Sequence, residues 1–202
     1  MIDRDKNKAV DSLVELESYG REHNIPILLG DSAHVLGNII KDLRPKSVLE
    51  IGTAIGYSSL IILGNADCRL TTVEIDEDRY RMACANFKHY GVEDRVLSVK
   101  ADAMDFLRDN KQKFDLIFLD GPKGQYIKYL EYLNMALNVG GTLVCDNVLF
   151  RGLVRSRENI PHRYRTIVVN LRKFISTLMT DKDYNTTIED IGDGLLIANK
   201  VQ

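Results

Sequence analysis

Two apolar, strand-like runs of the sequence end in side chains that could bind a hard metal ion. Asp120 follows the run that ends at Leu119, and Asp146 and Asn147 follow the run that ends at Cys145. Ligands of open α/β sheets bind at the carboxyl ends of the strands, so we expect these side chains to lie close together. Two carboxylates and an amide offer oxygen ligands, which favours Mg²⁺ over zinc. The alternative is that Asp120 and Asp146 merely cap loops.

Lys123 lies three residues after Asp120, in a segment that continues to Tyr126. Beside a bound dication the neutral amine is favoured, because like charge disfavours the ammonium form. Such an amine could accept the proton of a hydroxyl substrate, which makes Lys123 and Asp120 the candidate catalytic pair. The alternative for Lys123 is an ordinary solvated lysine in a turn.

A glycine turn follows the first strand-like run. Gly52 and Gly56 stand in it, and glycines there let the backbone approach a ligand closely. The G-x-G-x-x-G fingerprint of dinucleotide-binding folds is absent, which argues against a nicotinamide dehydrogenase. The carboxylate of Glu50 beside this turn suits a ligand with positive charge. S-adenosylmethionine, which carries a sulfonium and an ammonium group, is such a ligand.

Two further acids follow the next two strand-like runs. Glu74 ends the second run, where an acid accepts hydrogen bonds from ribose hydroxyls in nucleotide-binding α/β folds. Asp102 follows the third run and could face an adenine. A lone glycine turn is weak evidence for a cofactor site, but acids on successive strand ends are far less expected by chance.

The elements that must position these residues alternate between strand-like and helix-like patterns, which predicts a mostly parallel sheet with helices on both faces. The apolar runs suit strands buried on both faces. The expected parallel strands span residues 47–51, 70–75, 96–100, 114–119 and 142–145. A turn at residues 191–194 predicts a hairpin of strands 186–189 and 195–198, which adds an antiparallel edge.

Helical patterns fill the spaces between these runs. Asp76 and Gly91 are expected to begin and end one helix. Apolar periodicity predicts two more helices, one over residues 126–137 and one around residues 167–178. Residues up to Asp42 are typical of two helices separated at residues 24–26. We expect a single domain over residues 1–202, with N-terminal helices in 1–44 and the α/β core in 45–202.

The composition excludes several classes of protein. The 202 residues are 45% hydrophobic and carry a net charge of −2, so the molecule as a whole is not an electrostatic binder of polyanions. Three scattered cysteines favour reduced thiols and a cytoplasmic location. No leader pattern and no apolar run of membrane-spanning length is evident, so we expect no membrane partner.

From about Ile25 to the C-terminus, the chain resembles the cation-dependent O-methyltransferases of the catechol and caffeoyl-CoA type. The residues that carry this resemblance are segment 50–58, segment 73–76, the spacing of Asp120, Lys123 and Tyr126, and the pair Asp146 and Asn147. Within that group, segments 123–126, 146–154 and 192–195 most resemble the bacterial tRNA 5-hydroxyuridine methyltransferases, which make 5-methoxyuridine at the wobble position. One departure is Gly121-Pro122, where relatives commonly have His or Ala after the first metal acid.

The resemblance implies a Rossmann-like, seven-stranded, mostly parallel sheet with an antiparallel C-terminal strand, and a homodimer. It implies Mg²⁺ or another divalent cation on Asp120, Asp146 and Asn147. The residues that it implies for S-adenosylmethionine are Leu29, Glu50, Gly52, Thr53, Ser58, Glu74, Asp102, Ala103 and Asp120. Catechols and 5-hydroxyuridine both offer two adjacent oxygens to a metal, so the metal motif does not decide between these acceptors.

A basic segment follows the expected metal ligands. Residues 151–173 contain seven Arg or Lys against one Glu, a net +6 in a chain of net −2. Clustered arginines beside an active site suit phosphates, which favours tRNA as the partner. The expected RNA contacts are Tyr126, Arg151, Arg155, Arg157 and Arg163.

Three other interpretations stay open at this point. The first is that the arginines are only a solvated surface, in which case the acceptor is a small catechol-like molecule. The second is a non-catalytic RNA- or cofactor-binding protein, which has no need of the complete set of Asp120, Lys123, Asp146 and Asn147. The third is the nicotinamide dehydrogenase, which the missing glycine fingerprint already disfavours.

Overall fold

A computed structural model of the chain describes residues 4–28, 30–157 and 160–202, and it describes side chains from Leu13 onward. The strands are β1 (Ser47–Ile51), β2 (Arg69–Glu74), β3 (Val96–Lys100), β4 (Phe114–Leu119), β5 (Leu137–Cys145), β6 (Tyr184–Glu189) and β7 (Leu195–Lys200). The helices are α1 (Arg4–Glu22), α2 (Asp31–Leu43), α3 (Tyr57–Asn65), α4 (Glu77–His89), α5 (Ala103–Asp109), α6 (Tyr126–Ala136) and α7 (Arg165–Thr180). Short 3-10 turns are η1 (Glu93–Arg95), η2 (Lys123–Gln125) and η3 (His162–Tyr164).

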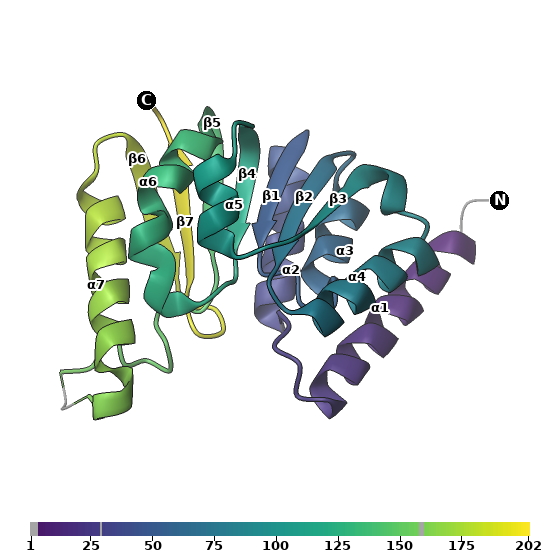
Figure 1. Cartoon of the computed structure of the whole chain (residues 1–202), viewed down its shortest axis with the longest axis horizontal. Coiled ribbons are helices and arrows are strands. Elements are labelled where there is room, and N and C mark those ends of the chain that lie inside the picture. The colour runs from purple at the N-terminus through teal and green to yellow at the C-terminus, as the bar shows by residue number, and fades with distance from the viewer. Residues whose placement is uncertain (1–3, 29, 158–159) are drawn as a thin grey trace.

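The seven strands form one sheet in the order β3-β2-β1-β4-β5-β7-β6 (Figure 1). Strands β1 to β5 pair in parallel, and β7 pairs antiparallel with both β5 and β6. Strand β7 therefore runs against the other six, which confirms the predicted Rossmann-like sheet with an antiparallel C-terminal strand. The direction of winding changes between β1 and β4, and ligands of such sheets bind at this switch point.

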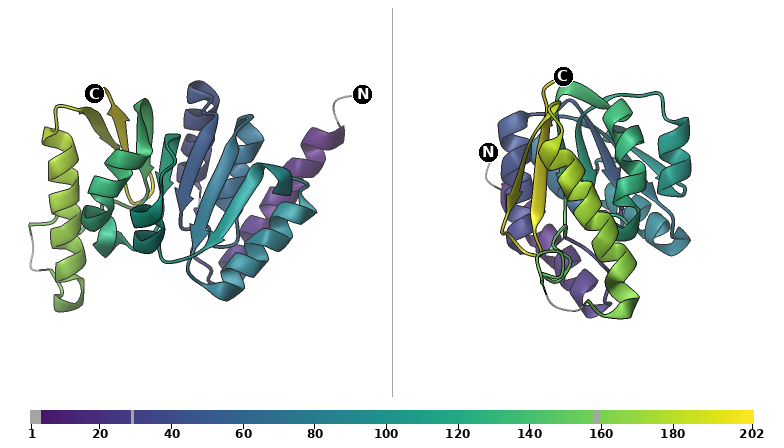
Figure 2. Two further views of the ribbon diagram at one scale, coloured as in Figure 1. Left: turned by 45° about the horizontal axis from the view of Figure 1, so that its top comes forward. Right: turned by 90° about the vertical axis from the view of Figure 1, so that its left-hand side faces the viewer.

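Helices cover both faces of the twisted sheet (Figure 2). Alternate side chains of β4 point to opposite faces, as a strand requires. Ile117 and Leu119 pack with α5, α6 and α7, whereas Leu116 and Phe118 pack with α1 to α4. The two cores bury β1 and β4 on both faces, which explains why most residues of these strands are apolar.

Most of the predicted elements are confirmed, and the largest difference lies at the start of β5. The sequence pattern assigned Leu137 to the preceding helix, but Leu137 pairs with Phe114 and begins the strand. A buried leucine fits both a helix face and a strand, so periodicity could not separate them. Helix α4 has the predicted cap, with the Asp76 carboxylate accepting from the Arg79 amide at 2.9 Å.

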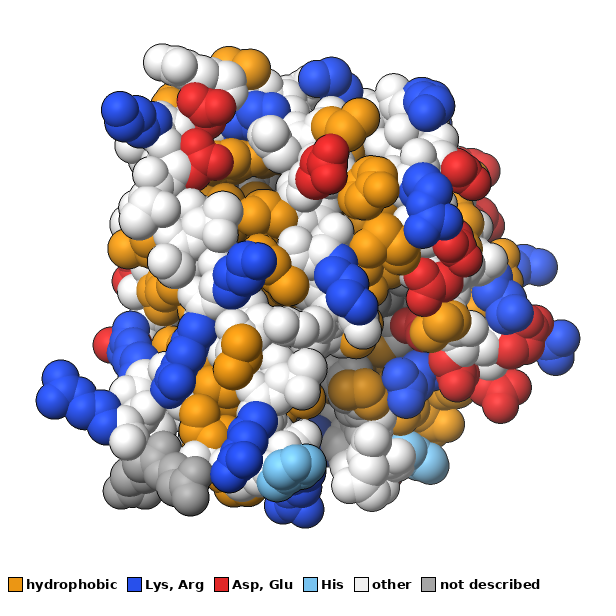
Figure 3. All heavy atoms as spheres, turned by 60° about the vertical axis from the view of Figure 1, so that its left-hand side comes forward, with side chains coloured by type: hydrophobic (Ala, Val, Ile, Leu, Met, Phe, Trp, Pro, Cys, Tyr) orange, Lys and Arg blue, Asp and Glu red, His pale blue; other side chains and the backbone are white. Residues whose placement is uncertain are grey.

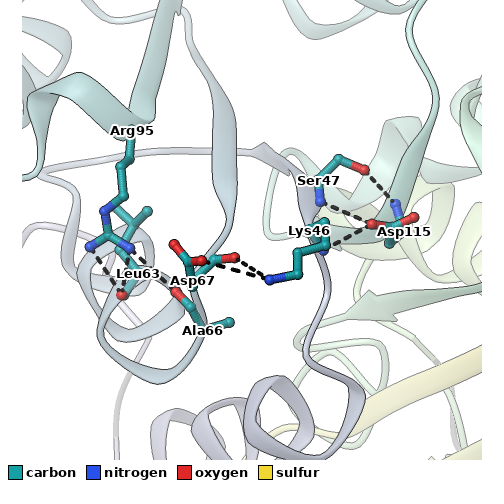
Figure 4. A network of polar contacts seen from close by, with 7 residues as sticks. All are labelled: Lys46, Ser47, Leu63, Ala66, Asp67, Arg95 and Asp115. Carbon is teal, nitrogen blue, oxygen red and sulfur yellow. Dashed lines mark hydrogen bonds and ion pairs between the residues drawn. The ribbon is translucent and has the colours of Figure 1, made fainter.

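The amino ends of the strands are joined by a polar network (Figure 4). Oδ2 of Asp115, near the start of β4, accepts from the backbone amides of Lys46 at 2.9 Å and Ser47 at 3.0 Å. Oδ1 of Asp115 accepts from the side-chain amide of Asn138 at 2.9 Å. These hydrogen bonds hold the starts of β1, β4 and β5 together.

Within the described ranges, no helix is both long enough and apolar enough to cross a membrane. Cys68, Cys84 and Cys145 are free thiols, as their scattered spacing predicts.

Candidate active site

A cavity of about 540 Å³ opens at the carboxyl ends of β1, β2 and β4, next to the switch point of the sheet. Seven of the residues that the sequence predicts for the site line this cavity. They are Gly52, Glu74, Asp102, Ala103, Asp120, Lys123 and Asn147. Residues up to 95 positions apart in the chain, Gly52 and Asn147, therefore meet in one place because parallel strands end at one edge.

Gly52 allows the loops after β1 and β4 to approach each other. Its φ of +100° is unfavourable for other residues, and a Cβ built there would lie 2.3 Å from the Asp120 carbonyl oxygen. The Asp120 amide also donates to the Ile51 carbonyl at 2.9 Å. Glycine at position 52 is thus required to bring the Asp120 backbone to the floor of the cavity.

Glu74 is held rigidly at the end of β2. Its Oε2 accepts from the Ala54 amide at 2.8 Å, and its Oε1 accepts from the Asp76 amide at 2.9 Å. Each carboxylate oxygen can accept a further hydrogen bond. The side chain is therefore preorganised to accept from the hydroxyls of a ribose, the role that the sequence predicts.

Asp102 lies at the cavity because it caps a helix that the sequence analysis did not predict. Its Oδ1 accepts from the amides of Met104 at 2.8 Å and Asp105 at 3.4 Å, which begins α5. An Asp that accepts from the amides two and three residues later is a common N-cap. The start of this helix could therefore have been predicted from the sequence.

Glu50, Thr53 and Ser58 were predicted to contact the cofactor, but the structure buries all three behind the cavity wall. The Glu50 carboxylate accepts from the hydroxyls of Ser58 and Thr72, each at 2.6 Å, and from Ser59. Burial raises the pKa of Glu50 to about 7, although these hydrogen bonds oppose the rise. In this structure Glu50 joins β1, β2 and α3 beneath the cavity instead of facing it.

The three predicted metal ligands lie together at the ends of β4 and β5. Asp146 is only 3% exposed, and its Oδ1 is buried without a hydrogen-bond partner among the described residues. Burial, together with the negative charge of Asp120, raises the pKa of Asp146 to about 6. Asn147 lines the cavity in a left-handed backbone conformation, with a φ of 55°. A buried carboxylate oxygen without a donor is costly, and a bound cation would offset that cost.

The donor set fits a hard cation. Over the described part of the chain, no group of three or more His, Cys, Asp and Glu side chains gathers into a metal site. Two carboxylates and one amide are instead the set that Mg²⁺ accepts when water or substrate completes its shell. Asp120, Asp146 and Asn147 therefore offer a donor set that suits a divalent cation.

Lys123 and Asp120 form an ion pair, with Nζ 2.5 Å from Oδ1 and both side chains mostly buried. The Lys123 ammonium also lies 5.6 Å from the ring centre of Tyr126. Tyr126 itself is fully buried, and its hydroxyl donates to the Leu119 carbonyl at 3.1 Å. The prediction that Tyr126 contacts RNA is therefore wrong for this structure, because a core side chain cannot reach a ligand outside.

The predicted RNA-contact arginines differ in what they contact. Arg151 donates to the Tyr164 hydroxyl at 3.1 Å, and Arg163 lies over the same ring at 4.6 Å. Arg155 pairs with Asp190 at the surface. Arg157 is exposed. Figure 3 shows Lys and Arg side chains gathered on the lower left of the face that carries α7.

Several residues that line the cavity were not predicted from the sequence. Arg79 lies in the first turn of α4, three residues after the Asp76 cap, and helical spacing could have placed it there. Tyr129 reaches the cavity from α6, and Pro26 and Ile27 close it from the N-terminal side. Leu29, the predicted backbone contact beyond them, lies outside the described residues.

Comparison with known proteins identifies the family. The profile of the O-methyltransferase family matches residues 2–201. A caffeoyl-CoA O-methyltransferase from Stellaria longipes is 30% identical, over 84% of this chain and 74% of its own length.

Solved structures agree with this assignment. A candidate caffeoyl-CoA O-methyltransferase from Staphylococcus aureus superposes with a TM-score of 0.86 at 28% identity, covering 98% of this chain and all of its own. The O-methyltransferase TomG from Streptomyces achromogenes, solved in complex with S-adenosylmethionine, gives 0.82 at 25% identity, covering 94% and 89%. Together with the strand-end acids and the cavity between them, these matches show that the chain belongs to the O-methyltransferase family, as an S-adenosylmethionine-dependent enzyme of the caffeoyl-CoA type.

Proposed function

We propose that this enzyme methylates a hydroxyl oxygen with the help of a divalent cation, preferably Mg²⁺, held by Asp120, Asp146 and Asn147. The observation that carries the proposal is the buried, unpartnered Oδ1 of Asp146 beside the charge of Asp120. A dication bound there would hold two adjacent oxygens of the acceptor and favour loss of the hydroxyl proton.

Lys123, as the neutral amine that a neighbouring dication would favour, is the group that would accept this proton. Its amine lines the cavity and is kept in place by Asp120 on one side and by the ring of Tyr126 on the other. Both contacts keep a flexible side chain in one position, which a general base requires. Asp120 thus has two roles, because one carboxylate oxygen accepts from Lys123 and the other stays available to a cation.

For the acceptor we propose the 5-hydroxyl of 5-hydroxyuridine at the wobble position of tRNA, which would give 5-methoxyuridine. The 5-hydroxyl and the 4-carbonyl of this base are two adjacent oxygens, as the cation requires. The exposed arginines that follow the metal ligands support a polyanionic acceptor.

The contacts of the arginines sharpen this proposal. Arg155 is paired with Asp190, and Arg172 donates to the carbonyl oxygens of Val154 at 2.8 Å and Ser156 at 2.7 Å. Both guanidinium groups are therefore already bound to other groups of the protein and are not assigned to phosphate binding. Arg151, Arg157 and Arg163 are the members that we propose for RNA, and the guanidinium groups of Arg151 and Arg163 lie beside the Tyr164 ring.

The test changes Arg151, Arg157 and Arg163 to Ala together. Binding of tRNA should weaken, and the slope of log affinity against log salt should fall by about two to three, since each lost phosphate contact contributes about 0.9. The matched control changes the exposed Lys88, Lys111 and Lys113 to Ala, which removes the same charge elsewhere. If the control variant weakened tRNA binding equally, the net charge of the protein, and not these three arginines, would account for the binding.

A second candidate acceptor is a small catechol-like molecule, which the caffeoyl-CoA relatives favour. Purified enzyme with S-adenosylmethionine and Mg²⁺ should therefore be offered hydroxylated tRNA and 3,4-dihydroxybenzoate side by side. We expect the tRNA to be methylated, with mass spectrometry of its nucleosides as the readout. If the catechol were methylated efficiently while the tRNA stayed unmethylated, the RNA proposal would be overturned. Only the assignment as an O-methyltransferase would remain.

A further inference from the structure

The turn between β6 and β7 contacts the segment that directly follows Asn147. The carboxylate of Asp193 accepts the backbone N–H of Arg151 at 2.5 Å and that of Gly152 at 3.3 Å. The Asp193 carbonyl accepts from the Leu149 amide at 2.9 Å. Residues more than 40 positions away in the chain thus determine the path of the backbone after the metal ligands.

That path is one that L residues avoid. Phe150, Arg151 and Gly152 have φ angles of 46°, 60° and 72°, three left-handed residues in succession. Backbone N–H groups in such a turn form a concave site for an anion. Here the anion is the Asp193 carboxylate, so Asp193 stabilises a conformation that the chain does not favour by itself.

The two segments also fit each other sterically. A Cβ at Gly194 would lie 2.4 Å from Cγ of Leu149, so residue 194 must be glycine for the turn to pack there. The Gly194 carbonyl accepts from the Val148 amide at 3.0 Å. The contact therefore extends along segment 148–152 and does not depend on one hydrogen bond.

Asn147 is the proposed metal ligand whose backbone lies nearest to this turn in the chain. It has a φ of 55° and lies between Asp146, fixed in the sheet edge, and the left-handed turn held by Asp193. Were the turn to relax, only the amides of Val148 and Leu149 would still hold the backbone that follows Asn147, so the restraint on Asn147 would weaken. The direction of its side-chain amide would then vary.

We propose that Asp193 is a positioning residue for the acceptor end of the active site, acting by holding the turn at residues 150–152 and thereby Asn147. This inference rests on the proposed function, in which Asn147 is the third cation ligand. Asp193 itself does not line the cavity.

The test compares Asp193→Asn with Asp190→Asn, which makes the same charge change in the same region of the hairpin but contacts the Arg155 side chain instead of the backbone. Hydrogen exchange of the amides in segment 147–157 should be about tenfold faster in Asp193→Asn than in the wild type, and it should be unchanged in Asp190→Asn. Binding of Mn²⁺, followed by electron paramagnetic resonance, should weaken about tenfold, as loss of supporting contacts does at metal sites. Affinity for S-adenosylhomocysteine should stay within about twofold of the wild type.

A rescue variant separates positioning from general stability. Arg151→Gly in the Asp193→Asn background should recover part of the Mn²⁺ affinity, because glycine adopts a φ of 60° without steric cost. Wild-type exchange and Mn²⁺ affinity in Asp193→Asn would overturn the proposal, as would equal weakening of S-adenosylhomocysteine and Mn²⁺ without rescue. If the wild type bound no Mn²⁺, the metal part of the proposed function would fail, whereas hydrogen exchange would still decide whether Asp193 holds the turn.

Discussion

The two ends of the sheet carry the same residue type with pKa shifts in opposite directions. At the amino end, Asp115 accepts hydrogen bonds from two backbone amides and one side-chain amide. Burial raises its pKa, but these hydrogen bonds outweigh it and hold the pKa below the usual value. At the carboxyl end, Asp146 is buried beside Asp120 with one oxygen unpartnered, and its pKa is raised to about 6.

The difference shows which end the fold uses for stability and which for chemistry. A carboxylate whose oxygens meet donors stabilises the folded chain. A buried carboxylate kept beside a like charge destabilises it, and such perturbed groups cluster at functional sites. The amino end is thus tied together by its own residues, whereas the carboxyl end is arranged for a group that comes from outside.

The largest effect is expected from Asp146→Ala. Activity with Mg²⁺ should fall by about 10³-fold or more, because a cation site contributes several kcal/mol to the transition state. The melting temperature should stay the same or rise, since a buried carboxyl with one unpartnered oxygen is removed. A chelator should abolish wild-type activity, and Mg²⁺ should restore it. Full turnover in chelator would end the cation-dependent mechanism.

The opposite pattern is expected from Asp115→Ala. Stability to urea should fall by about 2–3 kcal/mol, because the amides of Lys46 and Ser47 and the side chain of Asn138 lose their acceptor. Activity of the folded enzyme should change less than about twofold, as these contacts lie at the far end of the sheet. The control is Asp67→Ala, which breaks only the exposed 3.7 Å pair with Lys46 and should cost less than about 1 kcal/mol. Equal losses in the two variants would mean that the Asp115 network contributes no more than a surface pair.

The smallest effect is a pH dependence of stability without metal. Between about pH 4 and 6, Asp146 keeps its proton in the folded protein but loses it in the unfolded chain, so its contribution falls as pH rises. Relative to Asp146→Asn, the wild type should lose about 2 kcal/mol over this range. Glu50, whose pKa is about 7, contributes with the same sign in both proteins and cancels in the comparison.

Urea titrations of the two proteins in chelator, at several pH values, measure this difference. A constant gap between wild type and Asp146→Asn from pH 4 to 7 would show that Asp146 is not the perturbed group. For Asp115 the sign is reversed, because its lowered pKa gives stability that is present at neutral pH and lost on acidification.

Part of the site could be predicted because it depends on local pattern. Short apolar runs mark strands, and whatever follows a parallel strand lies at one edge of the sheet. This logic brought Glu74, Asp102, Asp120 and Asn147 to one cavity without any knowledge of the tertiary structure. The RNA contact expected of Tyr126 did not come from this logic, and it failed because packing against Phe174 decides which face of α6 Tyr126 lies on.

The sequence by itself therefore determined where the strands lie along the chain, the acids at their ends and the chemistry that these acids permit. Only the tertiary structure decided which carboxylates are satisfied, since the donors to Asp115 and the backbone held by Asp193 come from distant parts of the chain. The tertiary structure also decided that Glu50 lies beneath the cavity, that Arg155 pairs with Asp190 and that Arg172 donates to backbone carbonyls. The physical reason is that a residue's type fixes the hydrogen bonds it can make, whereas its burial and its partners are properties of the folded whole.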